Sequence, residues 1–93
     1  MFICYSGSYN CTRALNLSMI ESFAVVQDGC DTTSYKLVAY TPSYTADCES
    51  YILVKTNDYE SANHVLSEIL LAYSQGQQVC NITECLKNGK ENI

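Results

Sequence analysis

The chain of 93 residues contains no tryptophan, one proline and one histidine, and its basic residues are few. Ten acidic residues stand against five lysines and arginines, which gives a formal net charge of −5. Neutralisation of phosphates by Lys and Arg dominates affinity for nucleic acids and attracts proteins to anionic membranes, so this balance disfavours both kinds of partner. No apolar run approaches the roughly 20 residues that cross a bilayer. We therefore expect neither a nucleic-acid partner nor a membrane span.

Signatures of common enzyme sites are also missing. The sequence has no Gly-x-Ser-x-Gly, no phosphate-binding loop, no dinucleotide motif and no Cys-x-x-Cys. His64 lies on the polar face of a predicted helix, with Glu60 and Glu68 at i−4 and i+4, and we interpret this row as a solvated surface rather than a metal or acid–base site. The sequence thus predicts a protein that is not an enzyme and that binds no cofactor or metal.

Cysteine is abundant for a chain of this size. The six cysteines are Cys4, Cys11, Cys30, Cys48, Cys80 and Cys85. This density favours at least one disulfide and an oxidising compartment, because small cores usually need covalent support. The alternative is a set of six buried free thiols in a cytosolic protein. Cys4 and Cys11 are candidates for a local pair, whereas the residues alone give no partner for Cys30 or Cys80.

Length and composition indicate one globular domain, residues 1–93, with 47% apolar and 16% charged residues. The first ten residues carry no basic side chain and no long apolar segment follows, which is not the pattern of a signal peptide. A secreted or periplasmic location would mean that the leader is not part of this chain. The cytoplasm is the alternative location.

The clearest predicted element is a helix over about 58–75. Its apolar residues recur with the helical period and are expected on one buried face: Ala62, Val65, Leu66, Ile69, Leu70 and Tyr73. Asn57 is the expected N-cap, and Gly76 is the expected left-handed residue that ends the helix.

Three strand-like runs precede this helix and one follows it, over 18–26, 33–40, 51–55 and 78–83. This order predicts an α+β fold, either a small OB-like, partly open antiparallel β-barrel or an antiparallel sheet with the helix across one face. Residues 1–17 are expected to form an N-terminal extension or edge strand beside an OB-like core of residues 18–85. Residues 86–93 are expected to form a frayed tail.

Three stretches of the chain carry a resemblance to a known family. They are the run from Met19 to Gly29, the segment Tyr51-Ile52-Leu53-Val54 with Cys48 just before it, and the helix exit from Leu66 to Val79 with its Gly-Gln-x-Val pattern followed by cysteine. They resemble small secreted bacterial OB-fold proteins, including the B subunits of subtilase-type and typhoid-type AB5 toxins. The resemblance implies a ring-forming pentamer that recognises sugars, and a disulfide between Cys48 and Cys85.

Eight tyrosines occur in the chain, and they offer apolar area together with a polar hydroxyl. We expect Tyr35, Tyr51 and Tyr73 in the core. The hydroxyl-rich stretch formed by Tyr40, Thr41, Ser43, Tyr44 and Thr45 is the predicted binding surface for a glycan or protein ligand.

Leu71 lies roughly opposite the apolar face of the predicted helix, where a lone exposed leucine needs no explanation, and the family resemblance favours a contact between subunits at this residue. The leading hypothesis is therefore a non-catalytic, secreted or periplasmic binding module that forms oligomers. The alternative is a small cytosolic structural or interaction protein with free thiols that dimerises through a strand edge.

Overall fold

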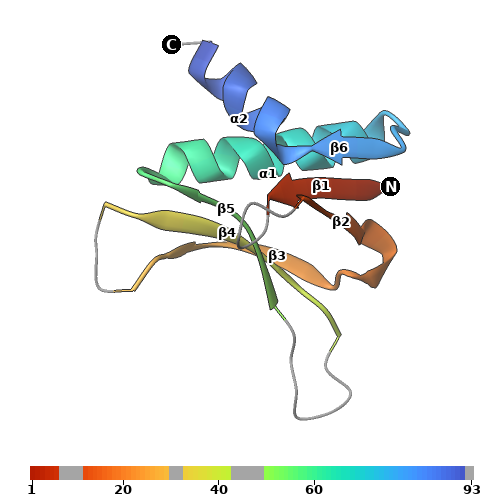
Figure 1. The fold of residues 1–93 in the computed structure, drawn as a ribbon, viewed down its shortest axis with the longest axis horizontal. Coiled ribbons are helices and arrows are strands. Elements are labelled where there is room, and N and C mark those ends of the chain that lie inside the picture. Colours follow the sequence, from red (N-terminus) through yellow and green to blue (C-terminus); the bar gives the residue numbers. More distant parts are fainter. Residues whose placement is uncertain (7–11, 30–32, 43–49, 92–93) are drawn as a thin grey trace.

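The computed structural model describes residues 1–6, 12–29, 33–42 and 50–91, with side chains up to residue 86 (Figure 1). The elements follow one another along the chain as β1 (Phe2–Ser6), β2 (Thr12–Asn16), the 3₁₀ turn η2 (Leu17–Met19), β3 (Ser22–Gln27), β4 (Tyr35–Tyr40), β5 (Ser50–Thr56), α1 (Tyr59–Ser74), β6 (Val79–Asn81) and α2 (Ile82–Glu91). The α+β class predicted from the sequence is confirmed.

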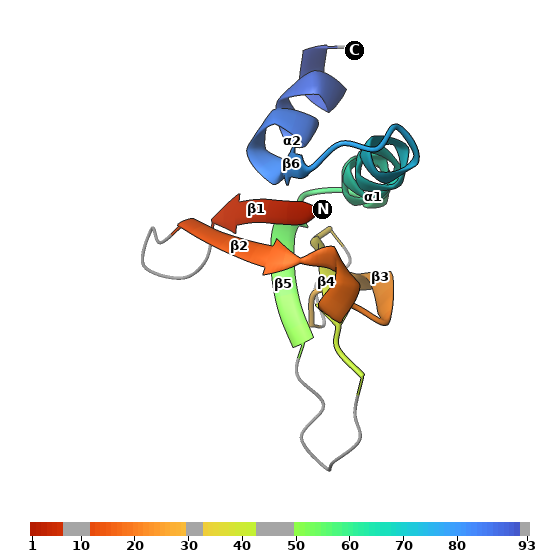
Figure 2. The same ribbon diagram turned by 90° about the vertical axis from the view of Figure 1, so that its right-hand side faces the viewer.

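Within the described residues the strands form two three-stranded sheets, which do not close into a barrel. One sheet has the order β2-β1-β6, with β1 and β6 parallel, and the other is the antiparallel meander β3-β4-β5. Figure 1 shows α1 lying along the side of the molecule where β1 and β6 run. Figure 2 shows the β1–β2 hairpin crossing β5. The meander, the helix and the return strand thus follow the predicted order.

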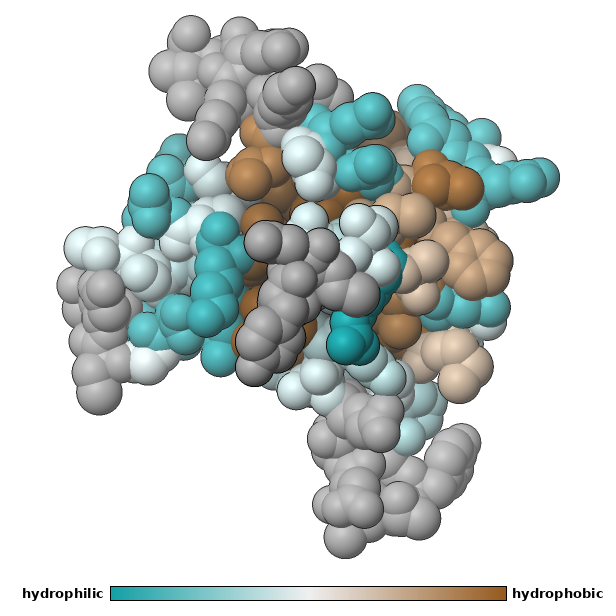
Figure 3. Space-filling view, in the orientation of Figure 1, coloured by the Kyte–Doolittle hydropathy of each residue, from teal (hydrophilic) through white to brown (hydrophobic). Residues whose placement is uncertain are grey.

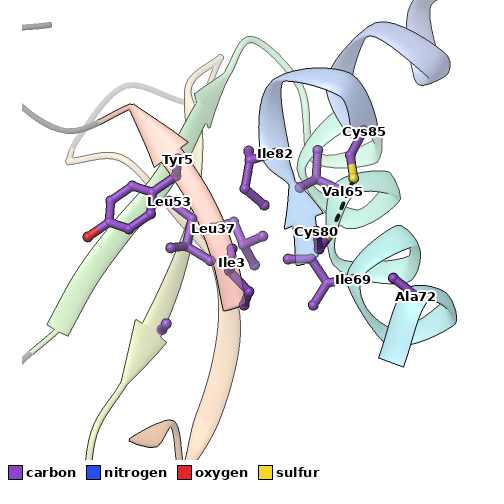
Figure 4. Packing of buried hydrophobic residues seen from close by; sticks show 11 residues of the cluster. Ile3, Tyr5, Leu37, Leu53, Val65, Ile69, Ala72, Cys80, Ile82 and Cys85 are labelled. Carbon is purple, nitrogen blue, oxygen red and sulfur yellow. Dashed lines mark hydrogen bonds between the residues drawn. The ribbon is translucent and has the colours of Figure 1, made fainter. Parts of the chain in front are cut away.

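The core lies between α1 and the two sheets (Figure 4). Its fully buried large side chains are Ile3, Leu37, Val65 and Ile69, which come from β1, β4 and α1. Because Ile3 is among them, the N-terminal strand is part of the core. β1 occupies the centre of its sheet, between β2 and β6, and within residues 1–17 it is β2 that lies at the sheet edge.

The buried face of α1 differs in part from the prediction. Ala62, Val65 and Ile69 are buried as expected, but Ala72 completes the face, while Leu70 and Tyr73 are 55% and 62% exposed. The helix therefore presents Val65 and Ile69, flanked by two alanines, to the sheets. Two of the largest apolar side chains near its C-terminal end remain outside the core.

Both ends of α1 are capped, one of them at a different residue from the prediction. Asp58, not Asn57, is the N-cap, and its carboxylate accepts a hydrogen bond of 2.6 Å from the Ser61 amide. At the C-terminal end the Gly76 amide donates to the Tyr73 carbonyl, and the Gln77 amide to the Ala72 carbonyl. This is a Schellman motif, and Gly76 has the predicted positive φ of 72°.

The chain after β6 contradicts the prediction of a frayed tail, because α2 covers Ile82–Glu91. The Asn81 side chain accepts a hydrogen bond of 3.0 Å from the Thr83 amide, which satisfies one of the free donors at the start of the helix. Ile82 and Cys85 on the first turns of α2 are buried in the core cluster. The strand expected over 78–83 is shortened to Val79–Asn81 for the same reason.

Candidate binding groove

An open groove of about 570 Å³ runs along β5, where the β1–β2 hairpin crosses it. Three of its lining residues come from the hairpin and six are consecutive in β5. The lining residues are Tyr5, Ser6, Arg13, Ser50, Tyr51, Ile52, Leu53, Val54 and Lys55. Such concave, partly apolar sites with a few polar groups are the usual form of a ligand site.

The groove exists because β5 is an edge strand. In the described ladders β5 pairs with β4 alone, so its other edge faces the hairpin. A β-bulge in β5 also contributes to the groove. The neighbours Leu37 and Val38 of β4 pair with Val54 and Ile52, which leaves Leu53 as an extra residue of β5. Leu53 is buried in the core cluster.

Tyr5, on β1, forms a further part of the wall. It is buried, and the register places it directly opposite Arg13 of β2. Arg13 is exposed, and it makes no ion pair with any residue of the described part of the chain. The arrangement therefore places an exposed guanidinium beside an aromatic, largely covered wall.

Among the described lining residues the charges are positive, although the protein is acidic. These residues include Arg13 and Lys55 and neither Asp nor Glu. Lys55 and Lys36 share the carboxylate of Asp28, which lies 3.7 Å from the Lys55 ammonium and 3.8 Å from the Lys36 ammonium. Arg13 is thus the cation best placed to meet an anionic group in the groove.

Of the predicted binding stretch, the structure describes Tyr40 and Thr41. Tyr40 is half-buried on β4 and pairs with Ser50, the first groove residue of β5. Thr41 is half-buried next to it. Ser43, Tyr44 and Thr45 lie outside the described residues. Arg13 and Tyr51 were missed as site residues, because their proximity depends on the crossing of two sheets and has no local sequence signal.

Of the three tyrosines expected in the core, one lies on the surface instead. Tyr35 and Tyr51 are half-buried, whereas Tyr73 is exposed and not part of the core. Tyr35 also packs edge-on against Tyr59, with ring centroids 5.8 Å apart, at the start of α1.

In the helical row of Glu60, His64 and Glu68, the side chains of His64 and Glu68 lie at ion-pair distance. The His64 Nε2 atom lies 3.7 Å from a carboxylate oxygen of Glu68, and it is covered from solvent without a hydrogen-bond partner. No group of three or more metal-ligating side chains occurs among the described residues. The row therefore does not assemble into a metal centre in this part of the structure.

Three of the six cysteines lie within the described residues, namely Cys4, Cys80 and Cys85, and none of them is bonded to another. The Sγ atoms of Cys80 and Cys85 lie 3.6 Å apart as a thiol–thiol hydrogen bond. Burial raises the pKa of both thiols, that of Cys85 to about 12. Cys11, Cys30 and Cys48 lie outside the described residues, and so do the predicted pairings that involve them.

Exposed apolar side chains occur on β1, η2, the C-terminal half of α1 and β6. Figure 3 shows brown and tan residues on the right of the view, with teal residues between them. We name the large exposed apolar residues on these elements the apolar side: Phe2, Met19, Leu70, Leu71, Tyr73 and Val79. Leu71, the predicted subunit contact, is 50% exposed.

Within the described residues, no helix is long and apolar enough to cross a membrane. The structure thus defines a small α+β protein with an open groove of positive charge along an edge strand. Comparison with protein-family models, with curated proteins and with solved structures finds no match to this chain.

Proposed function

We propose that the protein is a non-catalytic binding module and that its ligand is an acidic glycan held in the groove along β5. The observation that carries the proposal is the charge of the described lining residues, which include Arg13 and Lys55 and no acid, in a chain of net charge −5. A guanidinium binds a carboxylate through two parallel hydrogen bonds. The half-buried ring of Tyr51 supplies an apolar surface for the sugar ring.

The wider proposal is an OB-like module of the type found in AB5 toxin B subunits, acting outside the cytoplasm. Its support is the order β3-β4-β5-α1-β6 along the chain, which is a three-stranded meander, a helix and a further strand that pairs with β1. The sequence resemblance described above supports it as well. Tyr40, the first residue of the predicted hydroxyl-rich stretch, pairs with Ser50 of the groove, so a ligand in the groove would lie near Tyr40.

The test is a titration of the ¹⁵N-labelled protein with sialyllactose, an acidic trisaccharide, with neutral lactose as the reference ligand. We expect amide shifts at Ser6, Arg13 and Ile52 for the acidic sugar and weaker binding of lactose. Arg13→Gln removes a charge-assisted hydrogen bond worth about 1.5–3 kcal/mol, so affinity should fall by roughly 10-fold or more.

Lys36→Gln is the matched control, because it removes the same charge from a residue that does not line the groove. It should leave the affinity near that of the wild type. Equal binding of both sugars, shifts confined to other parts of the molecule, or equal losses in the two variants would each contradict the proposal.

We further propose that the apolar side mediates self-association, as expected for a ring-forming module. Its six large apolar side chains come from β1, η2, α1 and β6 and are each about half exposed or more. Monomeric proteins rarely expose large contiguous apolar patches. Native mass spectrometry measures the oligomer directly.

Leu71→Asp places a charge within the apolar side and should dissociate the oligomer. Asn63→Asp adds the same charge at an exposed position two turns earlier on α1 and should not. A monomeric wild-type protein at micromolar concentration would refute self-association and leave the groove proposal intact.

A further inference from the structure

Two of the described cysteines come together at the junction of β6 and α2. Cys80 is the central residue of β6, and Cys85 is the fourth residue of α2. Both are buried, and their sulfur atoms are 3.6 Å apart. Figure 4 shows the two side chains pointing toward each other from the strand and the helix. A disulfide needs a sulfur separation of about 2.05 Å, so the two atoms must approach by about 1.5 Å.

The strand register separates the third described cysteine from this pair. In the parallel ladder Ile3 lies opposite Cys80 and Cys4 lies opposite Asn81. Successive residues of a strand point to opposite faces, so Cys80 shares the core face with Ile3 while Cys4 points the other way. The half-buried Cys4 is therefore the poorer partner for Cys80.

A small pocket of about 180 Å³ gives access to the pair. It lies among α1, β6 and α2, and both Cys80 and Cys85 line it. Glu68 and Glu84 line it as well, and their charges help to keep the thiols protonated. A small, positively charged reagent therefore fits the pocket better than an anionic one.

We propose that Cys80 and Cys85 form an intrachain disulfide by exchange with a low-molecular-weight disulfide. One thiolate attacks the reagent, forms a mixed disulfide and expels one thiol. The second thiolate then attacks the protein sulfur of the mixed disulfide and expels the other thiol. Two S–H bonds are lost, one S–S bond forms, and two electrons pass to the reagent, which leaves as two thiols.

This bond ties the start of α2 to β6 and removes Cys85 from the Cys48–Cys85 pairing that the family resemblance implies. Because burial raises the pKa of both thiols, the reaction is slow at neutral pH. We therefore assign the pair a structural role, formed once under oxidising conditions, rather than that of a rapid redox sensor.

The experiment treats the reduced full-length protein with cystamine, a cationic disulfide, and then unfolds it in denaturant at mildly acidic pH with N-ethylmaleimide in excess, which blocks the remaining thiols. Digestion after glutamate separates the two cysteines, because Glu84 lies between them. Mass spectrometry should find the peptide that ends at Glu84 linked to the one that begins at Cys85, with the loss of both maleimide adducts.

The Cys4→Ser variant is the matched control and should give the same linked peptides. In Cys80→Ser the link should be lost, and Cys85 should become a maleimide adduct or a mixed disulfide. The proposal is overturned if Cys85 of the wild-type protein is linked to another cysteine. It is also overturned if both cysteines end as adducts or mixed disulfides at saturating cystamine.

Discussion

Replacement of Ile69 by alanine tests the observed orientation of α1 most directly. Ile69 is fully buried against the sheets, whereas its neighbour Leu70 is more than half exposed. The apolar periodicity of the sequence places both on the buried face, so the two substitutions distinguish the structure from the pattern.

The expected cost follows from the atoms removed. Ile69→Ala deletes three carbons, each worth about 0.8 kcal/mol of transfer free energy, and the cavity adds about 1 kcal/mol. The total of about 3 kcal/mol is a large part of the roughly 5–14 kcal/mol expected for a domain of this length. Leu70→Ala should cost about 0.5 kcal/mol or less, because its side chain already meets solvent.

Thermal unfolding followed by circular dichroism measures both variants. We expect the midpoint temperature of Ile69→Ala to fall by roughly 15 °C, at about 4–8 °C for each kcal/mol. The measurements should be repeated at several protein concentrations, because self-association through the apolar side would give Leu70→Ala a concentration-dependent cost. Equal, concentration-independent losses for the two variants would refute the observed orientation of the helix.

Two further predictions concern the ends of α1. Gly76→Ala should destabilise the protein by about 1–2 kcal/mol, because an alanine at φ 72° is strained even though an added Cβ would have no atom within 4 Å. An unchanged unfolding free energy would contradict the Schellman motif. The hydrogen bond from Ser61 lowers the pKa of Asp58 below 3.8, so this carboxylate stabilises the fold above that pH and the contribution is lost as pH falls through the lowered value. Asp58→Ala should therefore be less stable than the wild type at neutral pH and approach it in acid, whereas Asp58→Asn, which keeps a capping oxygen, should show no such change; a pH-independent difference for Asp58→Ala would argue against the cap.

Much of the secondary structure was predictable because it depends on local pattern. The helix over 59–74, the strands at 22–27 and 35–40, and the glycines with positive φ at Gly29 and Gly76 follow from apolar period and turn chemistry. The start of α2 also has a local capping pattern, because Asn81 is followed three residues later by Glu84. The same residues fit the end of the strand predicted over 78–83.

The groove was not predictable in the same way. Tyr5 and Arg13 precede Tyr51 by 46 and 38 residues in the chain, and only the crossing of the β1–β2 hairpin over β5 brings them together. The sequence indicated hydroxyl-rich residues around Tyr40 instead, because local composition is all that a single stretch can show. The bulge at Leu53 likewise depends on pairing with β4.

The sequence by itself determined the α+β class, the order of the meander, helix and return strand, and the acidic balance that disfavours nucleic acid. These properties follow from the periodicity and charge of neighbouring residues. Only the tertiary structure decided which side chains of α1 face the core, which strand has a free edge and which cysteines meet. Those outcomes depend on contacts between segments far apart in the chain, where the volume available between two sheets and a helix selects Ala72 over Tyr73 and places Cys85 against Cys80.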